Sequence, residues 1–296
     1  MESSRNEAAY LAAVLSQKNQ DDPKESAIRE KISATVLRDE WARAAFARVR
    51  DIQVAYLRDV VAHVADAEYV HAASQKVLRD IVEALPSQIV EGRETLESLP
   101  KAKPVLVATN HFGAYKLLGI NPKEELGVDI PGYTDMYPFP AYFAALNPVA
   151  KELGLGLYYS SNDFPGVFGE IHSKSGFIHI PALKEGRTAA LIEQTKQVVE
   201  RRPESAIVIF PEGTTSGKPT GMGPYALNSF KTGAYVLAAE LALPVVLVAQ
   251  YFHPSEGFKL KIFSATIPPK TDKAGYEALA AEQQRVMQEW LSAQEK

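Results

Sequence analysis

The sequence predicts an α/β fold in which helices flank a mixed, mostly parallel β-sheet, with an N-terminal helical region ahead of the sheet. Residues 7–85 carry apolar side chains at helical spacing among alternating charges. Beyond them the pattern changes to short β-branched runs separated by turns rich in glycine and proline. These runs alternate with further helical patterns, which is typical of a layered α/β architecture.

The N-terminal region is predicted to be helical because apolar residues such as Ile52, Tyr56 and Val60 recur about once per helical turn. The segment 85–103 contains prolines and several charges, so it is a plausible junction. We therefore divide the chain into a helical region, 1–95, and an α/β domain with a C-terminal helix, 96–296.

The expected elements of the second domain follow from the same patterns. Strands are predicted at 105–109, 156–159, 177–180, 207–210, 245–251 and 259–264. Helices are predicted at 185–202, 229–241 and 274–293.

The composition limits the classes of function. With 296 residues, 46% hydrophobic and 23% charged, the chain has the composition of a globular protein. A formal net charge of -4 gives no electrostatic reason to expect nucleic acid as a partner. The absence of cysteine excludes disulfides and thiolate metal sites. No group of His, Asp and Glu has metal-ligand spacing, so we predict no metal.

The cellular location is predicted from the apolar segments. The first twenty residues are polar, and the longest apolar stretch, 234–252, is divided by Glu240 and Pro244. This stretch is better explained as a helix followed by a buried strand. We expect a cytoplasmic protein, and peripheral contact with a membrane stays open because an amphipathic surface needs no spanning segment.

Two predicted strands end in loops that carry chemistry. Strand 105–109 is followed by Asn110 and His111, and strand 207–210 is followed by Pro211, Glu212 and Gly213. In open α/β sheets ligands bind beyond the carboxyl ends of the strands, so the two loops are expected to converge on one crevice. A neutral histidine can take a proton from a hydroxyl or an amine. A Glu-Gly-Thr turn offers a carboxylate, a hydroxyl and backbone amides to an acceptor.

These loops belong to four sequence blocks in a familiar order. The blocks are Asn110-His111, Phe210-Pro-Glu-Gly-Thr-Thr-Ser216, Phe230-Lys-Thr-Gly-Ala234 and the Pro-Val strand that starts at Pro244. In order and spacing the chain resembles the lysophosphatidate and glycerol-phosphate acyltransferases, within the lysophospholipid acyltransferase-like superfamily, over roughly residues 105–248.

The resemblance implies a glycerolipid acyltransferase fold and a role in phospholipid biosynthesis. It makes His111 the general base that activates an acceptor hydroxyl or amine to attack an acyl thioester. Acyl-CoA or the acyl carrier protein would be the co-substrate that donates the acyl group, with no bound cofactor. The implied substrate-binding residues are Asn110, Lys116, Glu212, Gly213, Thr214, Thr215 and Lys231.

Two positions depart from the family pattern. Lys116 stands where the family has the aspartate that orients the histidine, and an ammonium group has no lone pair for that purpose. Thr215 stands where the family has an arginine suited to phosphate recognition. Another carboxylate would have to replace the aspartate, and the downstream candidates are Glu124, Glu125, Asp129 and Asp135. Otherwise the protein is catalytically degenerate, retains the fold and binds an acyl ligand or a carrier protein.

Further residues bear on substrate and partner binding. Positive charge for a substrate phosphate is available from Lys116, Lys174, Lys184, Arg187, Lys218 and Lys231. An aromatic run at 133–143 is either plain core or the lining of an acyl groove. A basic patch for an acidic carrier protein would come from Arg29, Lys31, Arg38, Arg43, Arg48 and Arg50. His172 and His179 are expected to be ordinary structural residues.

Overall fold

A single mixed sheet organises the protein. The computed structural model describes residues 23–118, 122–127, 143–162, 166–180 and 186–295. In these residues seven strands pair in the order β1-β7-β6-β2-β5-β3-β4. The strands are β1 (Ser87–Glu91), β2 (Val105–Thr109), β3 (Gly156–Asn162), β4 (Phe177–Ile180), β5 (Ser205–Ile209), β6 (Val245–His253) and β7 (Gly257–Thr266).

The pairing of the strands is mostly parallel. β4, β3, β5, β2 and β6 run parallel to one another in that order, β7 is antiparallel to β6, and β1 is parallel to β7. The central strands β2 and β5 are buried along their whole length. Such continuous apolar strands are typical of parallel sheets that are covered on both faces. The predicted fold class is therefore confirmed.

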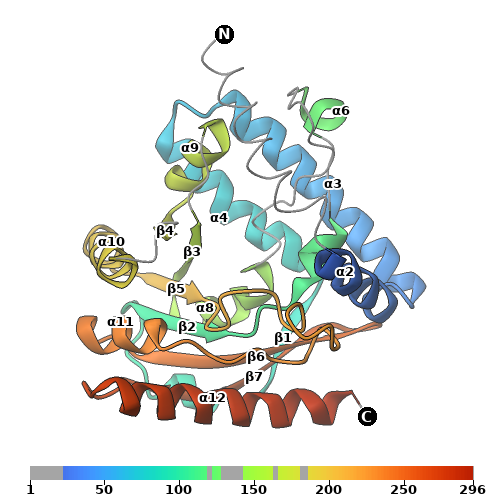
Figure 1. The fold of residues 1–296 in the computed structure, drawn as a ribbon. Coiled ribbons are helices and arrows are strands. Elements are labelled where there is room, and N and C mark those ends of the chain that lie inside the picture. Colours follow the sequence, from blue (N-terminus) through green and yellow to red (C-terminus); the bar gives the residue numbers. More distant parts are fainter. Residues whose placement is uncertain (1–22, 119–121, 128–142, 163–165, 181–185, 296) are drawn as a thin grey trace.

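Helices cover the sheet from two sides. Figure 1 shows α12 along one face and α2, α3 and α4 on the opposite side. The helices are α2 (Pro23–Val36), α3 (Glu40–Ala62), α4 (Ala67–Ala84), α5 (Glu94–Glu97), η1 (Gly113–Leu117), α6 (Pro122–Leu126), η2 (Ala144–Leu146), α8 (Asn147–Leu153), α9 (Gly166–Lys174), α10 (Arg187–Arg201), α11 (Gly233–Leu241) and α12 (Lys273–Gln294).

Aspartate caps begin three of the long helices. The side chains of Asp39, Asp66 and Asp272 accept hydrogen bonds from the backbone amides of Trp41, Tyr69 and Gly275 at the starts of α3, α4 and α12. These bonds satisfy amides that have no partner inside the first turn of a helix.

The six predicted strands are all present, and β1 is a strand that the sequence pattern does not predict. It lies inside the segment 85–103, before the division proposed at residue 95, and Ile89 is its buried residue. Its sequence Ser-Gln-Ile-Val-Glu is short and half polar, which suits an edge strand and gives little β-strand signal. Its carbonyl and amide groups find partners on β7, far along the chain.

Within the described ranges, no helix combines the length and the apolar character that crossing a bilayer requires.

Candidate active site

The site lies where β2 and β5 end. These two strands are parallel neighbours, with Ala108 opposite Ile209, so the loops that follow them leave the same edge of the sheet side by side. The backbone amide of His111 donates to Glu212 Oε1 at 2.8 Å, and the backbone amide of Ser216 donates to the carbonyl of His111 at 3.1 Å. The predicted convergence of the two loops is therefore present in the structure.

Glu212 joins three backbone segments. It is 2% exposed, and its two carboxylate oxygens accept four hydrogen bonds. Oε1 accepts from the His111 amide and from Ser216 Oγ at 2.6 Å, while Oε2 accepts from the Asn228 amide at 2.8 Å and from Asn228 Nδ2 at 2.9 Å. Burial raises the pKa of Glu212, and these donors lower it. All four partners donate, so the ionised carboxylate satisfies all of them at once.

Asn110 continues the ladder between β2 and β6 with its side chain. Its Oδ1 accepts from the amide of Gln250 at 2.7 Å and its Nδ2 donates to the carbonyl of Gln250 at 3.1 Å. Asn110 is fully buried. An asparagine at this point ends the strand and fixes the position of the next residue, His111, relative to the sheet.

The ring of His111 is held between an aromatic face and a backbone group. It stacks on Phe210 with ring centroids 4.2 Å apart and an interplanar angle of 16°, and Phe210 in turn stacks on Phe143 at 5.6 Å. The residue keeps part of its surface exposed, while its Nε2 atom is buried. The orientation of the His111 ring is thus set by its packing against Phe210.

The environment of His111 favours the neutral imidazole. The pKa of His111 is lowered to about 4, and burial is the largest cause. A hydrogen bond with the Thr214 backbone opposes this decrease, and the charge of Lys218 adds to it. A bond that raises the pKa of a histidine favours the protonated ring, so the Thr214 carbonyl accepts a ring N–H. The histidine is therefore a base in its neutral form at physiological pH.

The turn after Glu212 is shaped by glycines. Gly213 has φ +65°, and a side chain there would meet Lys231 Nζ at 2.9 Å, so the exposed Lys231 side chain lies across the turn. Gly217 has φ +72°, and a Cβ there would meet the carbonyl oxygen of Gly223 at 2.2 Å. Thr215 is buried, and its carbonyl accepts from Asn228 Nδ2 at 3.0 Å.

The residue at the family's aspartate position lies in η1. The side chain of Lys116 is outside the described part of the structure, as are those of Glu124, Asp129 and Asp135. The remaining downstream candidate, Glu125, forms an ion pair with Arg50 of α3, and its carbonyl accepts from Arg58. Replacement of the aspartate by Glu124, Asp129 or Asp135 stays a prediction.

Other predicted charges and aromatic residues are distributed around the fold. Lys174 donates to the Val64 carbonyl and pairs with Glu170, so it joins α9 to the helical region. Arg187 begins α10, whereas Lys184 and residues 133–142 of the aromatic run lie outside the described residues. The last residue of that run, Phe143, stacks on Tyr159 with centroids 3.6 Å apart.

The residues considered for a basic patch have varied surroundings. Lys31 donates to the Gly221 carbonyl, and Arg43 donates to the carbonyl of Leu37 at 2.9 Å. Arg38 and Arg48 are exposed, while the side chain of Arg29 lies outside the described residues.

His172 is fully buried and stacks on Phe177 at 4.0 Å, and burial lowers its pKa well below the usual value. In the described residues no group of three or more His, Cys, Asp or Glu side chains could hold a metal ion.

Sequence reasoning did not identify Ser216, Asn228 or Gln250 as parts of the site. Ser216 ends the Phe-Pro-Glu-Gly-Thr-Thr-Ser block, so the block itself carried a signal for it. Asn228 lies just before the Phe-Lys-Thr-Gly-Ala block, and Gln250 lies inside β6. The roles of Asn228 and Gln250 depend on contacts with residues far away in the sequence, and no local pattern marks these two residues.

The match to a family model agrees with the motifs. Residues 159–250 match the family model Acyltransferase, a segment that includes Glu212 and Lys231 and begins after His111. The solved structure of the 1-acyl-sn-glycerophosphate (LPA) acyltransferase PlsC from Thermotoga maritima aligns at 16% identity with a TM-score of 0.46, covering 85% of this chain and 93% of that chain. No curated protein matches the chain. Over the segment 159–250, the chain is therefore similar to the Acyltransferase family.

Proposed function

We propose that the protein transfers a fatty acyl group from acyl-CoA or acyl carrier protein to a hydroxyl or amine of a small acceptor, with His111 as the general base. The observation that carries this proposal is the junction of two loops at the ends of β2 and β5. A neutral imidazole lies there on a loop that Glu212 and Ser216 hold from both sides.

The chemistry requires one proton transfer in each direction. His111 accepts the proton of the acceptor hydroxyl or amine as the acceptor attacks the thioester carbonyl. The C–S bond then breaks, and the imidazolium returns the proton to the leaving thiolate. With a pKa of about 4, the neutral ring exceeds the protonated ring by a factor on the order of 10³ at pH 7.

The Thr214 carbonyl supports the base in the role that the family's aspartate has elsewhere. A histidine whose one ring nitrogen donates to a backbone carbonyl presents the other nitrogen as the acceptor, and this bond sets the tautomer. The stacking on Phe210 holds the plane of the ring. A carbonyl carries no full charge, so it stabilises the imidazolium less than a carboxylate does. We expect Lys116→Asp to raise the turnover number for this reason.

We propose that the acceptor lies over the turn of residues 212–215. Lys231 lies across Gly213, and Lys218 is close enough to lower the pKa of His111, so both ammonium groups border this turn. Two cations beside the base suit an acceptor that carries negative charge, and Thr214 adds a hydroxyl. Glu212 and Asn110 are proposed to act on the acceptor through the loops that they hold. We place the protein in the cytoplasm, with peripheral membrane contact through its surface.

The second candidate is a binding protein that retains the fold without turnover. The observation in its favour is the low basicity of His111, because burial and Lys218 both oppose the protonation that general-base catalysis needs. Such a protein would bind the acyl ligand or the carrier protein and release it unchanged.

The test is an acyl-transfer assay with both donors and a panel of phosphorylated and unphosphorylated acceptors. His111→Ala is compared with His253→Ala, a control in which a partly exposed histidine of the β6–β7 hairpin is removed. We expect turnover in the wild type and in the control, and a loss of at least about 10²-fold in His111→Ala. Unchanged turnover in His111→Ala would rule out His111 as the general base. An absence of turnover in every form, with retained acyl-ligand binding, would favour the second candidate.

A further inference from the structure

Residues 225–228 support the His111 loop at two points. The ring of Tyr225 stacks on Phe112, the neighbour of His111, with centroids 5.1 Å apart and an interplanar angle of 3°. Three residues later, Asn228 donates twice to Glu212, which accepts the amide of His111. A shift of this short segment would therefore move both supports of the histidine together.

One side chain of the C-terminal helix holds the segment between these two supports. Gln288 Oε1 accepts from the backbone amide of Leu227 at 2.7 Å, and Gln288 Nε2 donates to the carbonyl of Tyr225 at 3.1 Å. The amide thus bonds the backbone on both sides of Ala226, as a neighbouring β-strand would. Gln288 is half-buried on α12, which Figure 1 shows along the face of the sheet opposite α2–α4.

A continuous series of hydrogen bonds leads from α12 to the histidine. Gln288 fixes the Leu227 amide, and the next peptide carries the Asn228 amide that donates to Glu212. Glu212 then holds the His111 amide at 2.8 Å. Each step joins groups of fixed geometry, so a displacement at the first step is transmitted to the last.

We infer that Gln288 is a positioning residue for the proposed acyl transfer, which acts by fixing residues 225–228 beneath the His111 loop. The inference rests on the proposed function for its kinetic consequence. Its structural consequence, the placement of the His111 ring, is independent of that function.

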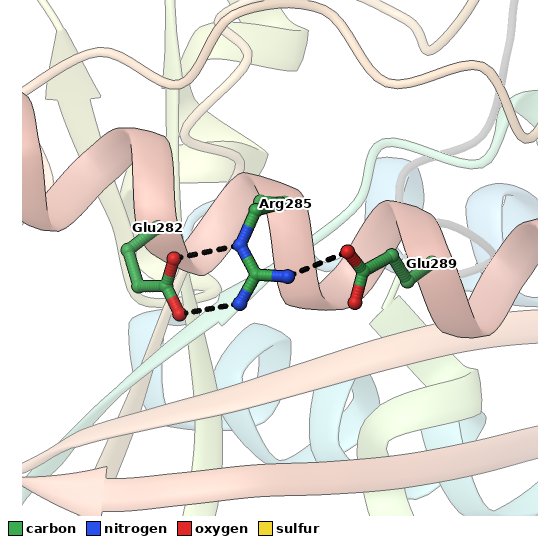
Figure 2. A network of polar contacts seen from close by, with 3 residues as sticks. All are labelled: Glu282, Arg285 and Glu289. Carbon is green, nitrogen blue, oxygen red and sulfur yellow. Dashed lines mark hydrogen bonds and ion pairs between the residues drawn. The ribbon is translucent and has the colours of Figure 1, made fainter.

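The same helix provides a matched control. Arg285 pairs with Glu282 and Glu289 on the exposed side of α12, as Figure 2 shows. The hydrogen bonds of this network join residues of α12 to one another and not to residues 225–228. Its removal costs surface ion pairs, which contribute little to stability.

The experiment compares Gln288→Met, which keeps the length of the side chain and loses its hydrogen bonds to Leu227 and Tyr225, with Arg285→Met. For Gln288→Met we expect the turnover number to fall about 10- to 100-fold with a smaller change in KM, because a misplaced base stabilises the transition state less. Arg285→Met should stay within about twofold of the wild type. Gln288→Glu, which keeps the acceptor for Leu227 and loses the donor for Tyr225, should fall in the same direction and serves if Gln288→Met does not fold.

A spectroscopic readout separates positioning from general stability. In the free protein, NMR titration of the His111 imidazole should show its pKa rise from about 4 toward 6.5 in Gln288→Met, since a loosened loop admits water. An unchanged His111 titration together with unchanged turnover would overturn the inference. If the wild type transfers no acyl group, the proposed function fails, and the titration alone decides whether Gln288 positions the ring.

Discussion

Replacement of Glu212 by glutamine tests whether this carboxylate holds the site together. The substitution keeps the shape of the side chain and exchanges one acceptor oxygen for a donor amide. If the remaining oxygen stays with His111 and Ser216, the new amide faces the two nitrogen donors of Asn228, and two of the four hydrogen bonds are lost. At about 1.5–2 kcal/mol for each bond to a charged acceptor, the loss amounts to about 3–4 kcal/mol.

The removal of a buried charge offsets part of this loss of stability. Burial is the largest influence on the pKa of Glu212 and raises it, so the ionised side chain carries a desolvation cost that glutamine avoids. With about 1 kcal/mol returned, the expected decrease in the free energy of unfolding is about 2–3 kcal/mol.

The assay is urea unfolding of Glu212→Gln beside Glu256→Gln. Glu256 is exposed and pairs with Lys259 in the β6–β7 hairpin, so its replacement should change the free energy of unfolding by less than about 0.5 kcal/mol. The variant Glu212→Gln should also lose turnover, because the Asn228 bonds to Oε2 hold the side chain whose Oε1 accepts the amide of His111. A decrease below about 1 kcal/mol for Glu212→Gln, similar to that of the control, would refute the assignment of Glu212 as the junction of the loops.

Two further predictions concern the loop and the pH response. Gly217→Ala should lower the free energy of unfolding by about 2–4 kcal/mol, because φ is +72° and the new Cβ would lie 2.2 Å from the Gly223 oxygen. Gly221→Ala, with a similar φ of +67° and nothing within 4 Å, should cost only about 1 kcal/mol, and equal losses in urea unfolding would contradict the steric argument. Because His111 binds its proton with a pKa of about 4 in the folded state and 6.5 in the unfolded state, the unfolded state binds more protons between these values. Stability should therefore fall as the pH drops from about 6.5 to about 4, by up to about 3 kcal/mol from this residue. Unfolding of His111→Gln over the same range should show a shallower decline, and an identical pH dependence would show that His111 is not buried in its neutral form.

The convergence of the two motif loops could be predicted because it depends on a general property of parallel sheets. Asn110 and Glu212 each follow a short apolar run, and both runs became neighbouring central strands of the sheet. The function of Glu212 within the site could not be predicted. A carboxylate in a loop is equally suited to bind an acceptor or to accept backbone amides, and only the positions of His111, Ser216 and Asn228 show that it does the latter. Its contact with an acceptor stays a prediction.

The low pKa of His111 could not be predicted from the sequence either. Burial is the main cause of its low pKa, and burial is a property of how helices and loops pack around a residue. The sequence showed that the aspartate position holds Lys116. The Thr214 carbonyl and the Phe210 ring, which orient the imidazole, became visible only in three dimensions.

By itself the sequence determined the local elements, the α/β class and the resemblance to the acyltransferases, because apolar periodicity and short motifs are encoded in neighbouring residues. Only the tertiary structure decided that β1 forms the edge of the sheet beside β7, that Glu212 joins three segments, and that Gln288 of the last helix bonds residues 225–228. These contacts join residues far apart in the chain. Their hydrogen bonds form only after the strands and helices have packed, so no local pattern records them.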